Sequence, residues 1–259
     1  FPEETHFSFF YAPLREEARL GRNVPRPYAI RPPVHHAQVF APGESFTFGL
    51  TLFGCRIELF PYVAIGLSEM GKHGIGRRVP ENAWERGKFR IEQVQAVNLL
   101  SGEAQVVLQS GNNLVHVPDL PMTLAHAQTQ AEAQMDDGPT TLQLRFLTPL
   151  RLTSKKQLVK QPHLQPLVAR LVDRHDSLAR EYGGEPLGKE AYQQMTAAAA
   201  QVELLDNATR WVDLGSYSRR SRRATPIGGL VGSATYRGDG ALRELLPLLA
   251  WGSVIQVGK

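Results

Sequence analysis

The sequence predicts an α+β fold made of two tandem ferredoxin-like domains, each an RRM-like βαββαβ unit. Alternating apolar residues indicate strands, and apolar residues at helical spacing that stop at glycine indicate helices. In the second half these elements follow one another as strand, helix, strand, strand, helix, strand, which is the split βαβ order. The first half contains only the later part of that order, so we expect its opening strand and helix to be absent.

The first domain is expected over residues 1–135. Six prolines between residues 13 and 44 predict extended, irregular chain, because proline fixes φ and removes a hydrogen-bond donor. Strands are expected at 7–11, 45–53, 88–97 and 104–109, the last two joined by a turn at 101–103. Helices are expected at 59–70 and 122–135.

The second domain is expected over residues 140–259, after a boundary at the turn-forming Asp-Asp-Gly-Pro of 136–139. We expect a strand at 141–152, then a helix at 165–182 that Gly183 ends. Residues 189–202 extend or flank this helix. Strands at 207–214 and 230–237 bracket an arginine-rich segment, and a helix at 242–250 leads to a last strand at 253–257.

Composition excludes several classes of protein. With 42% hydrophobic and 21% charged residues over 259 positions, the chain is globular rather than disordered. A single cysteine, Cys55, excludes an internal disulfide and a Cys-rich zinc site and fits a reducing cytoplasm. No apolar stretch approaches the roughly 20 residues of a membrane span, so no membrane partner is expected. The first ten residues lack the pattern of a signal peptide, and a start at Phe1 indicates a piece of a longer chain.

Positive charge is concentrated in one segment. The net charge is only +4, but five arginines and no acidic residue lie between residues 214 and 238: Arg219, Arg220, Arg222, Arg223 and Arg237. Such a field can hold phosphates, since arginine binds them through two parallel hydrogen bonds. The alternative is a solvated surface loop, which runs of charge commonly form.

Five motifs together resemble a known family. They are Leu-Arg-Phe-Leu-Thr-Pro-Leu at 144–150, Tyr-Ser-Arg-Arg-Ser-Arg-Arg at 217–223, Ile-Gly-Gly-Leu-Val-Gly at 227–232, Val-Gly-Lys at 257–259, and the glycines of 71–76 followed by Gly-Lys-Phe-Arg-Ile at 87–91. The first four, in this order, resemble the CRISPR-associated, repeat-processing endoribonucleases of the RAMP superfamily, which are built of two ferredoxin-like domains, and the fifth resembles the first domain of that family. The family's first strand and helix are absent here, and its glycine-rich segment continues past the position of Lys259.

The resemblance implies that CRISPR repeat RNA is the partner and substrate. Cleavage in this family needs no metal or other cofactor: the ribose 2′-hydroxyl attacks the adjacent phosphate and leaves a 2′,3′-cyclic phosphate. Other Cas proteins are compatible partners, and the oligomeric state is open. Two alternatives remain, a non-catalytic RAMP subunit or domain that binds RNA in an effector or spacer-acquisition complex, and a protein-interaction module on the same fold.

RNA contacts are expected in the arginine and glycine motifs. Tyr217 would stack on a base, and Arg219, Arg220, Arg222, Arg223 and Arg237 would hold phosphates. Gly228, Gly229 and Gly232 would let phosphates approach the backbone, although a β-bulge explains such glycines equally well. Lys259 would add a cation.

Histidine is the expected acid and base, because it titrates near neutral pH. His35 and His36 are the catalytic candidates, since they lie in a proline-flanked loop where functional side chains are common; the alternative is an ordinary surface loop. The family's base often lies in the early region that is missing here, so the base can also lie outside this chain. His175 falls on an apolar helix face and is expected to pack in the core. The sequence has no His-Glu-x-x-His, cysteine pair or clustered aspartates, so no metal site is expected.

Overall fold

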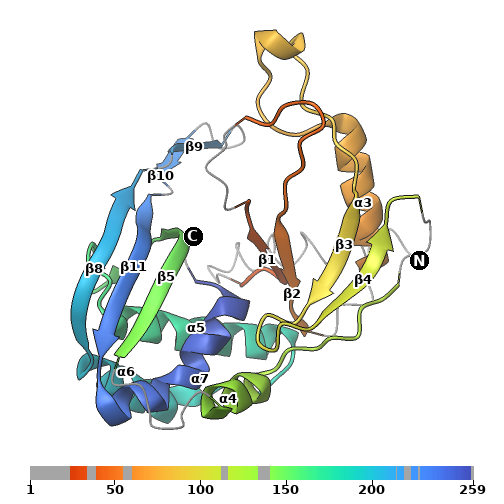
Figure 1. Ribbon diagram of the computed structural model, residues 1–259. Coiled ribbons are helices and arrows are strands. Elements are labelled where there is room, and N and C mark those ends of the chain that lie inside the picture. Colours follow the sequence, from red (N-terminus) through yellow and green to blue (C-terminus); the bar gives the residue numbers. More distant parts are fainter. Residues whose placement is uncertain are drawn as a thin grey trace. The chain divides into compact units, whose positions relative to one another are not determined.

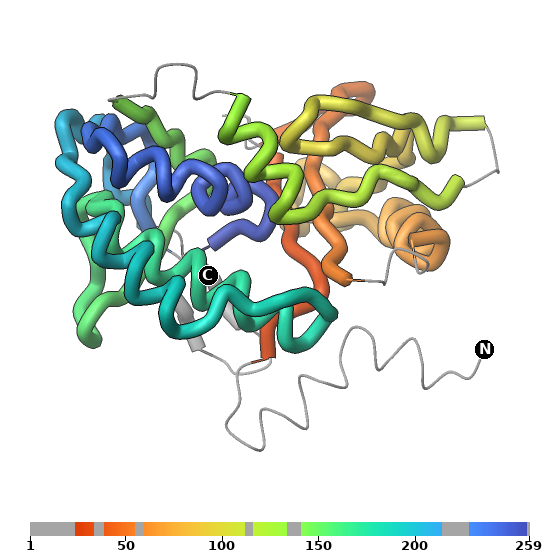
Figure 2. Tube along the Cα trace, turned by 90° about the horizontal axis from the view of Figure 1, so that it is seen from below, coloured from red at the N-terminus to blue at the C-terminus, as the bar shows by residue number. Residues whose placement is uncertain are grey.

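The computed structural model describes residues 24–33, 39–54, 60–111, 116–133, 141–213, 215–218, 223–226 and 228–257 (Figures 1 and 2). For 215–218 and 223–226 the description covers the backbone alone. Two compact units are formed: unit 1 joins Phe1–Leu52 to Leu124–Lys259, and unit 2 is Phe53–Thr123. The expected boundary at 136–139 lies outside the described residues, and the domain ranges 1–135 and 140–259 stay a prediction.

Unit 1 is built on a three-stranded antiparallel sheet. It consists of β5 (Thr141–Leu150), β11 (Gly229–Arg237) and β8 (Glu203–Val212), paired in that order. A ferredoxin-like unit places its first, third and second strands side by side in the same order. The three strands predicted from periodicity are therefore confirmed, each with a shift of a few residues at its ends.

Four helices belong to this unit: α4 (Leu124–Ala133), α5 (Leu164–Tyr182), α6 (Gly188–Ala200) and α7 (Asp239–Ile255). The apolar residues of α5 recur at helical spacing, and Val168, Leu171 and Val172 are almost fully buried. α5 packs on α6 and α7, and α4 packs on α7. Residues 189–202 flank the first helix rather than extend it, because Gly183 and Gly184 interrupt the chain with positive φ.

The prediction of a last strand at 253–257 is wrong, because α7 continues to Ile255. The buried face of this helix includes Leu245, Leu248 and Ile255, so the apolar residues after position 250 keep helical spacing. Gly252 lies on the same face, where a Cβ atom would come 2.9 Å from Leu171 Cδ2. Close packing against α5 therefore favours helix where the short apolar run alone indicated a strand.

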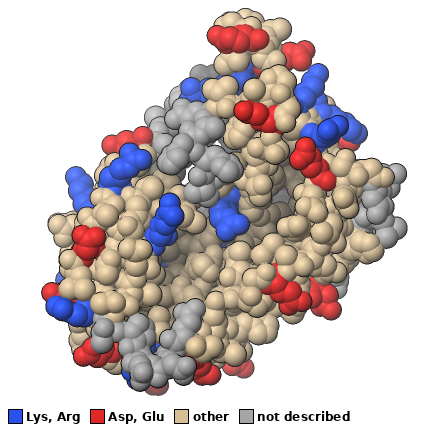
Figure 3. All heavy atoms as spheres, viewed as in Figure 1, with Lys and Arg blue, Asp and Glu red and all other residues tan. Residues whose placement is uncertain are grey.

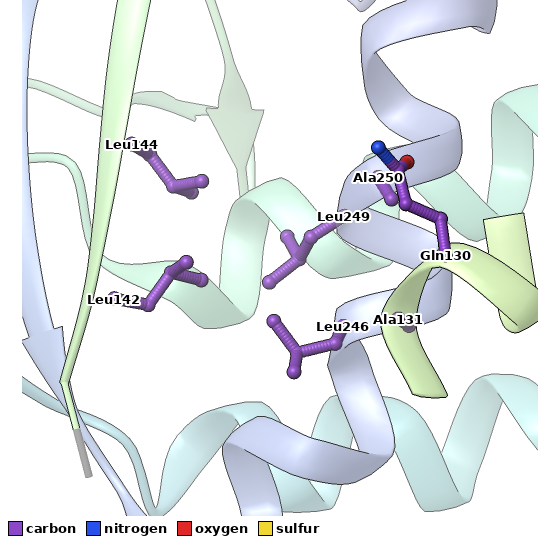
Figure 4. A pocket seen from close by; sticks show the side chains of 7 residues that line it. All are labelled: Gln130, Ala131, Leu142, Leu144, Leu246, Leu249 and Ala250. Atoms are coloured by element: carbon purple, nitrogen blue, oxygen red, sulfur yellow. The ribbon is translucent and has the colours of Figure 1, made fainter. Parts of the chain in front are cut away.

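α4, α7 and β5 meet around a cavity of about 140 Å³ (Figure 4). Leu142 and Leu144 of β5 point toward Leu246 and Leu249 of α7 across it. Gln130, Ala131 and Ala250 complete the lining. The alternating burial of β5 thus turns its leucines toward the helices, as the period of two predicted.

Short hairpins complete unit 1. β1 (Tyr28–Arg31) pairs with β2 (Gly49–Leu52), and β6 (Thr153–Ser154) pairs with β7 (Gln157–Leu158). β2 confirms the strand expected at 45–53, whereas β1 corrects the expectation of irregular chain. Prolines flank these four residues without interrupting them, so every ladder donor is kept. The strand expected at 7–11 lies outside the described residues.

Unit 2 contains α3 (Phe60–His73), a 3-10 turn η2 (Pro80–Asn82), and a hairpin of β3 (Gln93–Val97) and β4 (Ala104–Gln109). The hairpin confirms the predicted pair of strands, although the first begins later than residue 88. In its turn, the buried Asn98 accepts hydrogen bonds from the backbone N–H of Leu100 and Ser101 at 2.9 and 3.1 Å. Within the described residues, no helix has the length and apolar character needed to span a membrane.

The glycines of 71–76 close the base of a projecting loop, residues 76–86 (Figure 1). Ile75 and Gly87 exchange backbone hydrogen bonds of 2.8 and 3.0 Å, and Phe89 N–H donates to the Gly71 carbonyl. At Gly74, φ is +77° and a Cβ atom would lie 2.9 Å from Arg86 O. These glycines are required because two backbone segments touch there.

Candidate nucleic-acid interface

The glycine and arginine motifs meet at one end of the sheet of unit 1. β5 and β8 end there and β11 begins there, since Leu230 lies opposite Leu150 and Gly229 lies opposite Val212. The chain between β8 and β11 leaves this end as a further hairpin, β9 (Gly215–Ser218) paired with β10 (Arg223–Pro226). A glycine turn and an arginine-bearing hairpin are therefore placed together.

The sequence predicted an arginine-rich segment between two strands, and the structure shows that part of this segment forms the β9–β10 hairpin. The backbone of Tyr217 lies in β9, and that of Arg223 lies in β10. Ser218 lies opposite Arg223, so residues 219–222 connect the two arms. Arg219, Arg220 and Arg222 lie outside the described residues, and their RNA contacts stay a prediction.

Close strand packing accounts for the three glycines. A Cβ atom would lie 2.6 Å from Asp213 Oδ1 at Gly228, 2.7 Å from the Leu150 backbone at Gly229, and 2.4 Å from Ala208 O at Gly232. The pairing of β11 with β5 also shifts between Leu230 and Gly232, which is the β-bulge weighed from the sequence. These contacts explain glycine without a ligand, and a role in binding phosphate stays a prediction.

Arg151 holds the glycine turn in place, a role that the sequence did not reveal. Its Nη1 donates a hydrogen bond of 3.1 Å to the Gly228 carbonyl. Its guanidinium lies 5.9 Å from the ring centroid of Trp211, whose Nε1 donates to Asp213 Oδ1 at 2.8 Å. The turn is thus supported from β5 and β8 at once. The only feature of the sequence that could have indicated this role is that Arg151 directly follows the motif at 144–150.

Arg237 lies at the opposite end of β11. This nine-residue strand places Arg237 about 25 Å from Gly229, at roughly 3.3 Å per residue. Its Nη2 forms an ion pair of 2.8 Å with Glu203. The structure therefore does not bring Arg237 together with the glycine turn, and its expected RNA contact remains untested.

The catalytic candidates His35 and His36 lie outside the described residues, as does Lys259, so their roles stay predictions. His175 joins α5 to α7: its Nδ1 accepts a 3.1 Å hydrogen bond from Trp251 Nε1. Its Nε2 lies 3.1 Å from the Glu185 carbonyl, which can only accept, so Nε2 carries the proton. His175 is half-buried, so it links α5 to α7 by hydrogen bonds at the edge of the core rather than packing inside it as expected.

On the face drawn in Figure 3, Lys and Arg side chains are interspersed with Asp and Glu, and the described residues form no single basic patch there. No group of three His, Cys, Asp or Glu residues suited to a metal ion occurs in the described ranges. In the sequence, positive charge is concentrated in the arginine-rich segment between residues 214 and 238.

The described residues form an α+β fold in which a glycine turn and a hairpin lie at one end of the sheet of unit 1. Residues 144–259 match the family model of the CRISPR-associated endoribonuclease Cas6, and residues 3–120 match a model described as an N-terminal domain. Residues 144–259 are thus similar to the Cas6 family of CRISPR-associated endoribonucleases. A sequence comparison with curated proteins gives no match.

One solved Cas6 structure is similar in fold, and two others match with lower scores. A Cas6 product complex has a TM-score of 0.54 at 16% identity, covering 97% of this chain and 84% of that chain. Cas6 from Thermus thermophilus has a TM-score of 0.49 at 15% identity, with 98% and 84% covered. A Cas6 substrate mimic complex has a TM-score of 0.44 at 18% identity, with 97% and 84% covered. The product complex shows the fold, and the predicted fold class of tandem ferredoxin-like domains is confirmed.

Proposed function

We propose that this chain binds CRISPR repeat RNA and cleaves it to make guide RNA, without a metal ion. The observation that carries the proposal is that the Cas6 match begins in β5 and covers the glycine turn, Arg151 and the β9–β10 hairpin. These parts occupy one end of one sheet, where a backbone phosphate could reach all of them.

The reaction is an attack by the ribose 2′-hydroxyl on the adjacent phosphorus. It needs a base for that hydroxyl, an acid for the departing 5′-oxygen, and cations for the charge of the pentavalent transition state. We assign the proton transfers to His35 and His36. The arginines Arg219, Arg220, Arg222 and Arg223 hold phosphates, and Tyr217 stacks on a base. The products are a 2′,3′-cyclic phosphate and a 5′-hydroxyl.

Positioning is the part of this mechanism that the described residues support best. Arg151 fixes the turn by which the chain returns from the β9–β10 hairpin to β11. Fixing this turn lowers the entropy that is lost when the hairpin binds RNA. Arg151 is therefore a positioning residue in the proposed function.

The proposal is tested with end-labelled repeat RNA in EDTA, beside the same RNA carrying a 2′-deoxy substitution at the cleavage site. Cleavage of the unmodified RNA alone is expected, with a cyclic phosphate on the 5′ fragment. Binding of both RNAs without cleavage would instead support a non-catalytic RAMP subunit. Binding of neither would leave the protein-interaction alternative.

Two sets of variants separate catalysis from binding. Replacing His35 and His36 by Ala should abolish cleavage and leave RNA affinity within about twofold, since two histidines supply little of the positive charge that binds phosphates. Unchanged cleavage would remove both residues from the active site. Replacing Arg219, Arg220, Arg222 and Arg223 by Ala should weaken binding and lower the salt slope by about 0.7 for each phosphate that is no longer bound. An unaltered slope would refute their assignment.

A further inference from the structure

A polar cavity of about 600 Å³ lies in unit 1 beside the glycine turn. It is bounded by the β6–β7 hairpin, α5 and α6, and its volume is in the range of small-ligand sites. Its charged lining residues are Arg151, Lys155 and Arg170 against one carboxylate, Asp173. Among the described residues, neither Lys155 nor Arg170 forms an ion pair, so their charges remain available to a ligand.

The hairpin that borders this cavity has an unusual turn. Thr153 pairs with Leu158 and Ser154 with Gln157, which leaves two connecting residues, Lys155 and Lys156. Their φ angles are +48° and +64°, the left-handed region in which two-residue turns favour Asn-Gly. Lysine is costly in this conformation. Of the two lysines, Lys155 alone lines the cavity, and because strained backbone concentrates at functional sites we take its charge to be used there.

One side chain, that of Arg151, contacts both the cavity and the glycine turn. Arg151 lines the cavity and also donates to the Gly228 carbonyl. A strand of RNA at the glycine turn therefore has a cationic opening next to it. Tyr192 of α6 lines the same cavity and offers an aromatic ring, the side-chain type on which unstacked bases bind.

We propose that this cavity binds one unpaired nucleotide of the repeat RNA, next to the nucleotides held at the glycine turn. Lys155 and Arg170 hold its phosphodiester, Tyr192 contacts its base, and Asp173 accepts a hydrogen bond from a ribose hydroxyl. This inference rests on the proposed function and adds a subsite to it. The shared chemistry is a phosphate ester, which RNA and free nucleotides both carry, and the test separates the two.

The test compares two double variants of equal charge in the full chain. Lys155→Gln with Arg170→Gln removes the cavity cations. Lys156→Gln with Lys189→Gln removes two exposed cations that do not line it. Affinity for repeat RNA is measured by fluorescence anisotropy over a range of salt concentrations. The cavity variant should bind about 10-fold more weakly, with a salt slope lowered by about 0.7 to 1.4, while the control stays within about twofold. Equal losses in both variants would overturn the proposal.

A second measurement locates the nucleotide directly. Ultraviolet cross-linking of wild-type protein to repeat RNA, followed by mass spectrometry, should give a nucleotide adduct on Tyr192. That adduct should disappear in the cavity variant and persist in the control. Its absence from wild-type protein that cleaves RNA normally would refute the subsite and leave the proposed function standing.

A titration with adenosine and uridine monophosphates distinguishes the source of the phosphate. Binding at micromolar concentration that depends on Lys155 and Arg170, together with unchanged RNA affinity in the cavity variant, would assign the cavity to free nucleotides and overturn the RNA subsite. If wild-type protein neither binds nor cleaves repeat RNA, the proposed function fails first, and the subsite fails with it.

Discussion

Replacing Gly232 by Ala should destabilise unit 1 strongly, because β8 and β11 touch at this position. The added Cβ atom would lie 2.4 Å from Ala208 O and 3.0 Å from Thr209 Cα, both backbone atoms that cannot move without disturbing the sheet. The φ angle of Gly232 is +123°, which L-amino acids rarely adopt. Two independent costs therefore act at one residue.

The magnitude follows from these two costs. A residue forced into a sparsely populated backbone region costs about 1–3 kcal/mol, and overpacking a closed site costs about 1–3 kcal/mol. We expect the free energy of unfolding to fall by about 4 kcal/mol, which lowers Tm by roughly 10 °C. The measurement is urea and thermal unfolding followed by tryptophan fluorescence. A Trp84→Phe background leaves Trp211 and Trp251, which both belong to unit 1.

Gly240→Ala provides the matched control in the same unit. Gly240 lies in the first turn of α7, where an added Cβ atom would meet nothing within 4 Å. This variant should be as stable as wild type, or more stable by up to about 1 kcal/mol, because Ala favours helix over Gly. If Gly232→Ala unfolds at the wild-type urea concentration, the close approach of the strands is wrong. The glycine would then need a functional explanation.

Three further variants test other parts of the fold. Burial raises the pKa of Tyr236 above its ordinary value of 10.0, so its contribution to stability is complete below about pH 10 and is lost as pH rises further. In Tyr236→Phe, the hydrogen bond of 2.5 Å to the Pro162 carbonyl is removed, so the unfolding free energy at neutral pH should be about 1–2 kcal/mol below that of wild type. In urea titrations above pH 10, the unfolding free energy of this variant should decrease less steeply with pH than that of wild type. Asp176→Ala removes a buried carboxylate that accepts hydrogen bonds from two backbone N–H groups at the start of α6 and from Arg180. The unfolding free energy measured in urea should fall by about 3 kcal/mol. A loss below about 0.5 kcal/mol would show that this carboxylate does not stabilise the start of α6. Lys156→Gly relieves a left-handed residue and should raise unfolding free energy by about 0.5 kcal/mol, whereas a decrease would show that the turn is unstrained.

The spacing of apolar residues in the sequence correctly predicted the helices and strands that bury one face and expose the other. The helix at 164–182 carries a regular apolar face and ends at Gly183, so sequence and structure agree to within one residue. The strands of the three-stranded sheet were found for the same reason. Strand β1 was not predicted because it has only four residues and prolines flank it on both sides. The β9–β10 hairpin was not predicted because its strands, GSYS and RATP, have no apolar period.

The sequence motifs identified several residues of the candidate site, but they did not show which residues lie close together in the fold. The glycines were identified, and the structure adds their packing reason. Arg151 was missed because its partner, Gly228, is 77 residues away, a contact that no local pattern encodes. Arg237 was grouped with the other arginines by nearness in sequence, although the length of β11 separates it from them.

The strand order of this sheet also constrains how the protein can be made. β11 is the central strand, and β5 and β8 have no hydrogen bonds to each other, so neither edge strand has its partner until the last strand has been synthesised. At about 5–20 residues per second, the roughly 90 residues from β5 to the end of β11 take several seconds to emerge from a ribosome. During that interval both edges expose unpaired backbone groups. The expression yield of this protein should therefore depend more strongly on chaperone supply and growth temperature than the yield of a protein whose sheet consists of adjacent hairpins.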